Sequence, residues 1–349
     1  MSETRFAVAV PARNEARLLP LLLQSLVVQD TGWASGHVVV VANNCNDGTA
    51  DIANSFSSRL PLTVIDAEFS AGEAHVGTAR KLALDTACDW IERGSGGTGT
   101  LLTTDADAIV PVDWVSANLS ALANCDLVGG RLVIAHRDAG STVLQEKLDT
   151  YWHLVRTVDA IIDPQDHDPP PRHGDHTGAS LAFGCRLYRT LGGLTALQTR
   201  EDVDFVTRAL LTGVRLRHAP EVGVRVSTRT VGRASGGMAA EMMRRQANIG
   251  LPGDYRMPHP EDWIDLSLAR RRLRGAWRND SDLAKALVRE GIDPAATSAI
   301  LRECPNNIAF VERASAGLRR EERQQITVDA ALALFQLLKA NAFDLEAVA

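Results

Sequence analysis

The first two-thirds of the chain alternates short apolar runs with stretches whose apolar residues recur at helical spacing. The apolar runs predict strands at 6–10, 38–42, 62–65, 100–104 and 126–134. Helical spacing follows the first and the third of these runs, at 19–28 and 76–91. Runs that are apolar along their whole length are buried on both faces, which is typical of parallel strands covered by helices. The pattern therefore predicts an α/β fold with a mainly parallel sheet sandwiched by helices.

The rest of the chain departs from this alternation in two places. Residues 163–178 are rich in proline and histidine, which predicts an irregular loop of a length that is often functional or mobile. Later in the chain strand signals vanish, and helix start and stop residues mark helices at 281–290 and 328–340. We therefore expect a sheet domain at 1–236 and a helical C-terminal appendage at 237–349.

Polar side chains cluster where the predicted strands end. The segment PARNE, 11–15, follows the first strand, NNCND, 43–47, follows the second, and DAD, 105–107, follows the fourth. Ligands of open α/β sheets bind beyond the carboxyl ends of the strands. We expect the three clusters to converge on one crevice.

Composition narrows the functional classes. The formal net charge of -6 argues against wholesale nucleic-acid binding. The five cysteines are odd in number and form no CxxC pair, so we expect reduced thiols rather than a disulfide framework or a zinc site. The N-terminus lacks the marks of a signal peptide, and no run reaches the ~18 apolar residues of a membrane span. These features predict a soluble, cytoplasmic protein with no transmembrane segment.

Asp105 and Asp107 form a pair of carboxylates beside the predicted core. Residues two apart in an extended segment point to the same side, and like charges there repel unless a cation or a proton intervenes. Mg²⁺ or Mn²⁺, held by these acids, by water and by substrate phosphates, would resolve the repulsion. The alternative is a solvated turn, or Asp107 as the cap of a helix that starts near Pro111.

Glu201 and Asp202 begin a second stretch of chemical interest, an amphipathic helical pattern. Acids favour the positive end of the helix dipole, so helix capping explains one of them. The other reading is that an acid here removes the proton from an attacking hydroxyl.

The motifs that carry a family resemblance are AVAVPARNEARLLPLLLQSL, VVVVANNCNDGTADIA, GTARKLALDTA, LLTTDADAIVPVDWV and LGGL with REDVDF. In this order they resemble the family 2 glycosyltransferases of the GT-A fold, which is Rossmann-like. The resemblance covers about residues 5–230, and it assigns nucleotide-sugar binding and catalysis to the domain at 1–236.

The resemblance implies how the donor would be bound. Residues that match the segment embracing the nucleoside are Pro11, Ala12, Arg13, Asn14 and Glu15. Asn43 stands where the family has an acid that contacts the base, and its amide can both accept and donate, which leaves the base open. Asp47 matches a later acid of the same motif.

The resemblance also implies the catalytic set. Arg80 matches the arginine of the family's Ala-Arg-Asn, with Lys81 in place of the asparagine. Arg80 would pair with the diphosphate or brace the metal-site acids, the alternative being an exposed arginine on a helix. Asp107 would bind the metal, with Asp105 on the ribose or on a metal-bound water. The acid pair of the family matches Glu201 and Asp202, with Asp202 as the base.

Weaker signals lie outside these motifs. Arg229 and Arg233 are candidates for binding the diphosphate or an acidic acceptor, the alternative being a solvated turn. His218 is expected to be structural, within a strand, and His173 and His176 with Asp175 are too few for a zinc site on their spacing. By resemblance the loop at 163–178 would be a lid or an acceptor contact.

Two helical segments suggest partners. The basic stretch at 268–278 would either contact an anionic membrane or a partner, or present a solvated face. The C-terminal helix is expected to pack on the rest of the chain or on a second subunit, as in a homo-oligomer.

The residues and the resemblance together predict a metal-dependent, hexosyltransferase-like enzyme. It would move a sugar from a nucleoside-diphosphate donor to an unidentified acceptor hydroxyl, and the resemblance implies inversion. The alternatives are a nucleotidyltransferase on a related fold and a sugar-nucleotide-binding protein without activity. PARNEA has one arginine and no glycine, unlike the Gly-rich basic loop of a nucleotidyltransferase.

Overall fold

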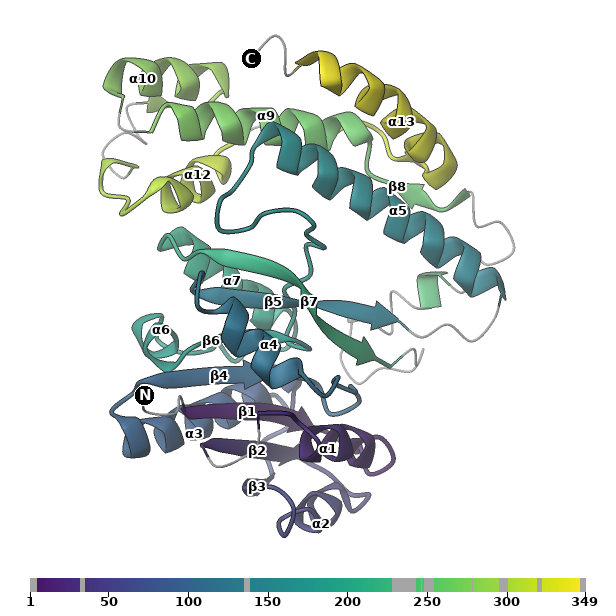
Figure 1. Cartoon of the computed structure of the whole chain (residues 1–349), viewed down its shortest axis with the longest axis vertical. Coiled ribbons are helices and arrows are strands. Elements are labelled where there is room, and N and C mark those ends of the chain that lie inside the picture. Colours follow the sequence, from purple (N-terminus) through teal and green to yellow (C-terminus); the bar gives the residue numbers. More distant parts are fainter. Residues whose placement is uncertain are drawn as a thin grey trace. The chain divides into compact units, whose positions relative to one another are not determined.

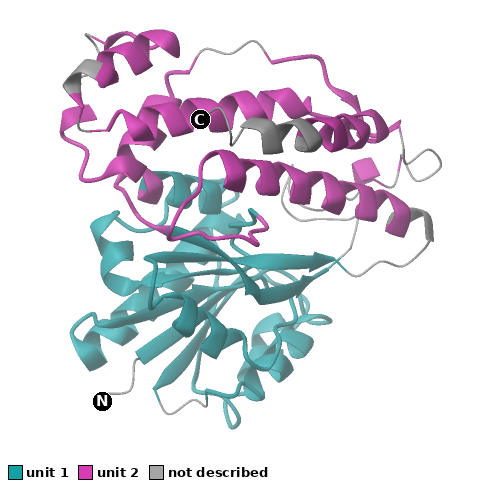
Figure 2. Ribbon diagram, turned by 45° about the horizontal axis from the view of Figure 1, so that its top comes forward, with its two compact units in different colours: residues 1–135, 174–208, 216–242 teal, residues 136–173, 209–215, 243–349 magenta. Residues whose placement is uncertain are grey.

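The computed structural model describes residues 5–31, 35–134, 139–227, 243–245, 247, 254–277, 279–294, 301–318 and 322–345. The chain divides into two compact units, coloured separately in Figure 2. Unit 1 comprises residues 1–135, 174–208 and 216–242, and unit 2 comprises residues 136–173, 209–215 and 243–349.

Unit 1 is built on a seven-stranded sheet with the strand order β3-β2-β1-β4-β6-β5-β7 (Figure 1). The strands are β1 Arg5–Ala12, β2 Gly36–Asn43, β3 Leu62–Ala67, β4 Gly99–Thr103, β5 Leu127–Ile134, β6 Leu181–Gly184 and β7 Leu216–Val226. All neighbours pair in parallel except β6, which is antiparallel to both β4 and β5. The helices are α1 Leu19–Val27, α2 Thr49–Asn54, α3 Val76–Ser95, α4 Trp114–Ala121, α6 Cys185–Thr190 and α7 Glu201–Leu211, whose last turn belongs to unit 2. The predicted α/β fold is confirmed.

The sheet is covered on both faces because its central strands are apolar throughout. Phe6 and Val8 of β1 join a buried cluster with α1 and with Trp114 of α4. Ala7 and Ala9, which alternate with them, are equally buried and belong to the opposite face, since successive side chains of a strand point to opposite sides. Helix α3 packs against β1, β2 and β4. Every predicted strand is present in this sheet.

Unit 2 is mainly helical, as predicted for the C-terminal region. Its elements are α5 Ala139–Ile162, β8 Arg256–Met257, α9 Pro260–Gly275, α10 Asp280–Arg289, α12 Asn307–Ser315, β9 Ile326–Thr327 and α13 Val328–Leu345. The expectation of no strands in this region is wrong, because β8 and β9 form a short antiparallel pair. Helix α5 was not foreseen; its Tyr151 packs edge-on against Phe335 of α13 in the core of this unit. A division of the chain at residue 236 stays a prediction.

The basic stretch on α9 is engaged within unit 2. Arg272 pairs with Glu290 and Arg274 with Asp163, at 2.6 and 2.9 Å. Arg270 pairs with Glu312 of α12. These pairings replace the solvated basic face that the sequence suggested. No helix within the described ranges combines the length and the apolar character that crossing a bilayer requires.

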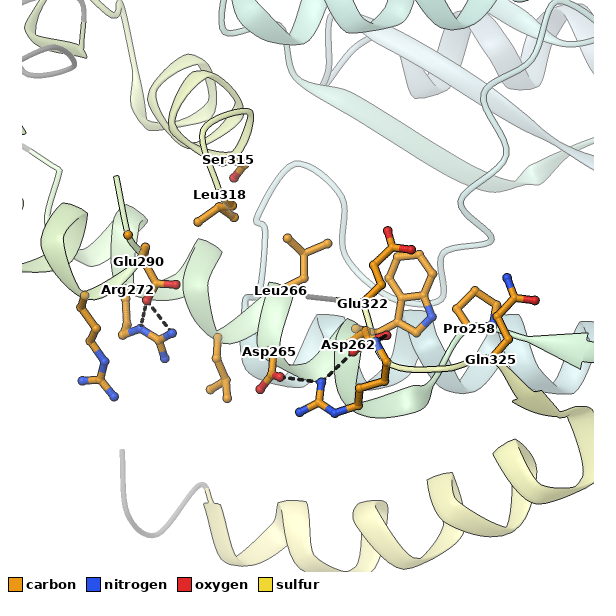
Figure 3. Close-up of a pocket in the computed structure, with 15 residues that line it drawn as sticks. Pro258, Asp262, Asp265, Leu266, Arg272, Glu290, Ser315, Leu318, Glu322 and Gln325 are labelled. Atoms are coloured by element: carbon orange, nitrogen blue, oxygen red, sulfur yellow. Dashed lines mark hydrogen bonds and ion pairs between the residues drawn. The ribbon is translucent and has the colours of Figure 1, made fainter. Parts of the chain in front are cut away.

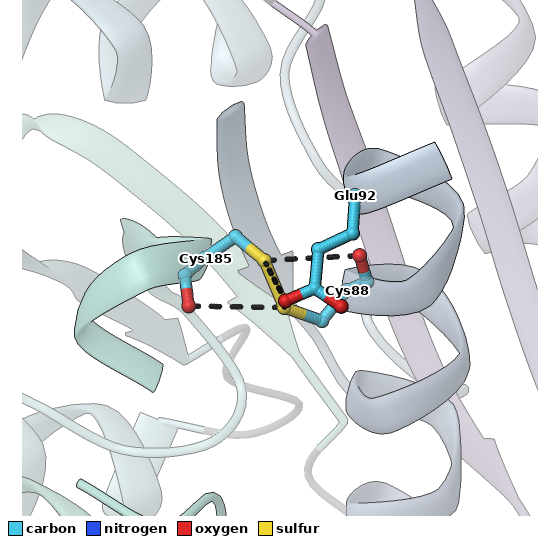
Figure 4. A group of neighbouring side chains, drawn as sticks. All are labelled: Cys88, Glu92 and Cys185. Carbon is cyan, nitrogen blue, oxygen red and sulfur yellow. Dashed lines mark hydrogen bonds between the residues drawn. A yellow bond between two sulfur atoms is a disulfide. The ribbon is translucent and has the colours of Figure 1, made fainter. Parts of the chain in front are cut away.

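Two cysteines of unit 1 form a disulfide, which corrects the expectation of reduced thiols. Cys88 of α3 and Cys185 of α6 are joined across 97 residues of sequence, and both are fully buried (Figure 4). Pairs this distant leave no spacing signal, because it is the packing of α3 beside α6 that brings them together. The other three cysteines, Cys45, Cys125 and Cys304, are not part of a disulfide in the described structure.

Candidate active site

The two acids that follow β4 lie in a turn and not in the extended segment from which their common orientation was predicted. Asp105 and Asp107 are half-exposed, whereas the alternating Ala106 and Ala108 are buried. The turn is closed by the Ala108 N–H, which donates to the Asp105 carbonyl at 3.1 Å. Both acids lie just beyond the carboxyl end of β4 and are more exposed than Ala106 and Ala108.

Arg80 of α3 holds the centre of this region. Its guanidinium donates to Asp105 Oδ1 at 2.7 Å and to Glu201 Oε1 at 2.9 Å. It also donates to Thr103 Oγ1 and to the Gly178 carbonyl, both at 2.8 Å. Arg80 is only 3% exposed, so it is not the exposed helix arginine that one reading allowed. Of the two remaining readings, bracing the acids agrees with these contacts.

The electrostatics of Arg80 follow from its neighbours. Burial alone lowers the pKa of this guanidinium, because a charged group is costly away from water. The negative charges of Asp105, Glu201 and Asp202 outweigh that cost and raise the pKa above its usual value. Arg80 thus stays cationic and offsets part of the mutual repulsion of the acids.

Gly178 links Arg80 to the second acid of the pair, and sequence reasoning missed it. Its carbonyl accepts from Arg80, while its backbone N–H donates to Asp202 Oδ2 at 2.6 Å. A Cβ at this position would lie 2.5 Å from Arg80 Cζ, so only glycine lets the loop approach so closely. The available signal was a glycine at the end of the His-rich loop, and it does not distinguish a contact from a turn.

Glu201 and Asp202 open α7, as predicted. Glu201 is 3% exposed and its carboxylate is taken by Arg80. Asp202 is half-exposed, with Oδ1 accepting from the Val203 N–H at 2.8 Å and Oδ2 from Gly178. Each carboxylate oxygen has a further lone pair, so Asp202 keeps the capacity to accept a proton from a bound hydroxyl.

The loops after β1 and β2 are fastened to each other. Glu15 N–H donates to Thr49 Oγ1 at 2.9 Å, and Ala16 N–H donates to Asp47 Oδ2 at 3.0 Å. Burial raises the pKa of Asp47, but the hydrogen bonds from Thr49 and Ala16 outweigh it and lower the pKa overall. Asn14 adopts φ 52°, which asparagine tolerates better than most residues. These hydrogen bonds join the predicted nucleoside segment, 11–15, and the loop after β2 into one rim.

Asn43 and Arg13 both contact the segment that leads into α3. Asn43 Nδ2 donates to the His75 carbonyl at 3.1 Å, and Arg13 Nη1 donates to the Ala74 carbonyl. The His75 carbonyl also accepts from the Ala79 N–H at 3.3 Å, and an amide at position 43 adds a second donor that an ionised acid could not supply. Within the described part of the chain, Asn43 Oδ1 is buried without a hydrogen-bond partner.

Protein ligands for a metal beyond the two acids are not evident in the described ranges. There, the group of three potential ligands within 4.8 Å of one another is Cys88, Glu92 and Cys185, and its two cysteines are joined in the disulfide (Figure 4). His176 Nδ1 lies 3.3 Å from Nε2 of His218, which is in β7 as expected. Arg229 and Arg233 lie outside the described residues.

Arg200, directly before the acid pair, has an unusual backbone. Its φ is 61°, in the left-handed region. That region costs an L-residue with an ordinary side chain roughly 1–2 kcal/mol. Its side chain is exposed. The sequence did not single out Arg200, because arginine as a residue type does not indicate a left-handed backbone.

A separate cavity of about 1140 Å³ lies in unit 2, along α9 (Figure 3). Its charged lining is largely self-paired, with Arg323 on Asp262 and Asp265 and Arg272 on Glu290. None of the site residues predicted from the sequence lines it. The cavity therefore carries no part of the chemistry described above.

Comparison with known proteins bears on the fold and on the class of enzyme. No family model matches the chain. The chain is 25% identical over 244 residues to the glycosyltransferase AglE of Haloferax volcanii, which covers 60% of this chain and 76% of that protein. It shares its fold with the mannosyltransferase PcManGT of Pyrobaculum calidifontis, in complex with GDP-Man and Mn²⁺, at a TM-score of 0.50 and 23% identity, over 90% of this chain and 87% of that one. S. aureus TarS in complex with UDP matches at a TM-score of 0.49 and 16% identity, over 90% of each chain.

The sequence relative and the shared fold agree with the resemblance read from the motifs. The strand-end acids are assembled on one side of a sheet that glycosyltransferases also use. Together these findings support a glycosyltransferase of the nucleotide-sugar transferase type.

Proposed function

We propose that this chain transfers a sugar from a nucleoside-diphosphate donor to an acceptor hydroxyl, with a divalent metal at the Asp105–Asp107 pair and Asp202 as the base. One observation carries the proposal. Asp105 precedes Glu201 and Asp202 by 96 residues or more in the sequence. The three acids nevertheless meet through Arg80 and Gly178 at the carboxyl end of β4. The proposed catalytic domain is 1–236, with a helical region at 237–349.

The donor set suits Mg²⁺ or Mn²⁺. Both ions prefer oxygen ligands and complete their shells with water and substrate phosphates, so two carboxylates suffice from the protein. Asp105 already gives one oxygen to Arg80, whose positive charge weakens its hold on a cation. We therefore assign direct ligation to Asp107 first and to Asp105 second. A bound ion would stabilise the negative charge that develops on the departing diphosphate.

The donor nucleoside is assigned to the rim formed by residues 11–15, Asn43 and Asp47. The mannosyltransferase of the same fold binds GDP-Man and Mn²⁺. We propose ligands of the same two classes here, a nucleoside-diphosphate sugar and a divalent cation. Arg229 and Arg233 remain candidates for the diphosphate or an acidic acceptor.

Asp202 acts on the acceptor. Its half-exposed carboxylate would take the proton of the attacking hydroxyl, which typically contributes about 10²–10⁴-fold to the rate. Glu201, buried against Arg80, fixes the start of α7 and so the position of Asp202. Attack on the side opposite the leaving group would invert the anomeric centre.

The first experiment is a thermal-shift panel of UDP-, GDP-, ADP- and TDP-sugars with and without Mn²⁺. A donor present at 100 times its dissociation constant should add about 2.7 kcal/mol of stability. The stabilisation is expected for one nucleotide class and to depend on Mn²⁺. If no nucleotide raises the melting temperature, donor binding is wrong.

Site variants then separate binding from chemistry. Asp107→Ala should abolish metal-dependent donor binding, and Asp202→Asn should spare donor binding but lower turnover by about 10²-fold or more. Asp113→Asn is the matched control, because this exposed acid precedes α4 without a side-chain capping bond. Normal turnover in Asp202→Asn would remove Asp202 as the base.

A further inference from the structure

The cavity that runs along α9 in unit 2 is large and extended. Its volume of about 1140 Å³ exceeds the roughly 300–1,000 Å³ of most small-molecule sites. Arg272 and Glu290 lie at one end of it, and Pro258 and Gln325 lie at the other (Figure 3). Asp262 and Arg272 line it from positions ten residues apart on α9, so the cavity follows about 15 Å of helix axis. A ligand that fills it is a short chain of units.

The charges of the lining nearly cancel. Four acids and three arginines contribute to it, namely Asp262, Asp265, Glu290, Glu322, Arg272, Arg289 and Arg323. Most of them are paired with one another, since Arg323 holds Asp262 at 2.6 Å and Arg272 holds Glu290 at 2.6 Å. A phosphate would require an excess of cations, and a divalent metal would require acids that are not already paired. The lining therefore favours a ligand without charge.

The cavity also presents polar groups that the protein leaves unused. Within the ranges that the structure describes, no hydrogen bond or ion pair engages the side chains of Glu322, Gln325 or Arg289. Ser315 lines the cavity as well, and its Oγ is buried without a partner among the described residues. A buried polar atom without a partner is costly, so such an atom in a cavity wall points to a ligand group that completes it. A hydroxyl both donates and accepts, and it suits a ligand group that does the same.

Trp263 supplies the cavity with an aromatic surface. Its Nε1 donates to the Tyr151 hydroxyl at 2.8 Å, and its ring packs edge-on against Trp152, with the ring centroids 5.6 Å apart. The ring is half-buried in these contacts, and it lines the cavity. Because the indole N–H is used inside unit 2, the part of Trp263 that a ligand meets is carbon. Leu266 and Leu318 add further apolar surface.

We propose that the cavity along α9 binds an uncharged oligosaccharide. A sugar ring combines a face of C–H groups, which suits the ring of Trp263, with hydroxyls that donate and accept, which suit Ser315 and Gln325. A peptide fits less well, because it calls for a strand edge or a continuous apolar groove, and charged side chains interrupt the apolar surface here. All of the lining residues belong to unit 2 and none to the acid cluster of unit 1, so the site does not depend on the proposed transfer reaction.

Ligand-observed NMR titration of the full chain, without nucleotide or metal, tests the proposal. The probes are maltotetraose, cellotetraose, mannotetraose and chitotetraose. We expect at least one of them to bind with a dissociation constant in the millimolar range or below. Its monosaccharide should bind at least tenfold more weakly, because it fills only part of the cavity. Absence of binding by every probe overturns the proposal, and so does equal affinity for an uncharged Gly-Ser peptide of similar length.

Variants of the lining assign the binding to this cavity. Ser315→Ala removes the unpaired hydroxyl, so it should weaken saccharide binding at least threefold while the melting temperature stays equal or rises. Gln325→Ala should also weaken binding and leave the melting temperature unchanged. Gln324→Ala is the matched control, because this neighbour is equally exposed but is not part of the lining, and it should change neither quantity. Wild-type affinity in both Ser315→Ala and Gln325→Ala overturns the proposal.

Two substitutions of one residue isolate the aromatic contact. Trp263→Phe and Trp263→Leu both lose the hydrogen bond to Tyr151, but only phenylalanine keeps an aromatic face. We expect the leucine variant to bind the saccharide at least tenfold more weakly than the phenylalanine variant. Equal affinity in the two folded variants overturns the proposal. Asp107→Ala should bind the saccharide as the wild type does, and loss of binding there would assign the saccharide to the proposed metal site instead.

Discussion

Two arrangements of arginine and acid in this molecule differ in how charge is shared. In unit 1, Arg80 alone serves Asp105 and Glu201, and Gly178 brings Asp202 to the same cluster. On α9 of unit 2, three arginines each have their own acid, in the pairs Arg270–Glu312, Arg272–Glu290 and Arg274–Asp163. In a one-to-one pair the arginine and the acid neutralise each other's charge, and the pair holds its two segments together. A shared guanidinium leaves excess negative charge, which is what a cation with its phosphates can complete.

Removal of the shared arginine should produce the largest effect. Arg80→Gln leaves Glu201 buried beside other carboxylates, and breaking a buried ion pair typically costs about 3–5 kcal/mol. Urea unfolding checks the loss. Arg270→Gln in unit 2 is the control, because both partners there are partly exposed and such a pair contributes about 1 kcal/mol or less. Equal losses of unfolding free energy in the two variants would contradict the difference between the shared arginine and the one-to-one pairs.

The disulfide should produce the next largest effect, and it sharpens the contrast because it reinforces the helix that carries Arg80. Cys88→Ser with Cys185→Ser should cost roughly 2–4 kcal/mol, as is usual for a cross-link of a long loop. Thermal unfolding with and without reductant measures the loss. In Cys45→Ser, which leaves the disulfide intact, reductant should still lower stability. Five titratable thiols in the denatured, unreduced wild type would contradict the cross-link.

A smaller change tests the contact between Gly178 and Arg80. Gly178→Ala places a methyl group against the guanidinium and should cost about 1–3 kcal/mol through overpacking. Turnover should fall together with stability, because Asp202 is held by the same loop. Gly184→Ala is the control, since nothing lies within 4 Å of a Cβ there. If both variants transfer sugar at the wild-type rate, the contact between Gly178 and Arg80 does not position Asp202.

The smallest effect concerns His37, which belongs to neither arrangement. Burial first, and then the charges of Arg5 and Arg93, lower its pKa in the folded state. The unfolded chain therefore binds more protons below the ordinary pKa of about 6.5, so the stability contribution is complete above that pH and is lost as pH falls. His37→Gln should flatten the fall in melting temperature between pH 7 and pH 5.5. An unchanged slope would show that other groups govern this range.

The sheet could be predicted from the sequence because its central strands are apolar on both faces. The runs at 6–10 and 38–42 indicated buried parallel strands, and they are β1 and β2. The positions of Asp105 and Asp107 followed from the same logic, since polar residues at strand ends gather on one edge. Helix α5 was not predicted although its apolar spacing is as marked as that of α1, and the two-residue strands β8 and β9 are too short to give a pattern.

The connections inside the site could not be predicted. Glu201 lies 121 residues after Arg80, and no local pattern reports that they touch. Gly178 acts through backbone atoms, which every residue possesses, so its sequence signal is the lack of a side chain. The same limit hid the Cys88–Cys185 pair. Sequence patterns identified the chemical groups, and packing decided which group met which.

The antiparallel direction of β6 has a consequence for how such proteins diversify. Since β5 runs parallel to β4 and β6 runs against both, the chain between β5 and β6 departs from and returns to a single rim of the sheet. An insert there can be lengthened, shortened or exchanged without rethreading any strand. The segment that leaves this rim carries α5, whose Tyr151 packs against Phe335 in the core of unit 2, so exchanging it would remove part of that core while every strand of the seven-stranded sheet kept its connections.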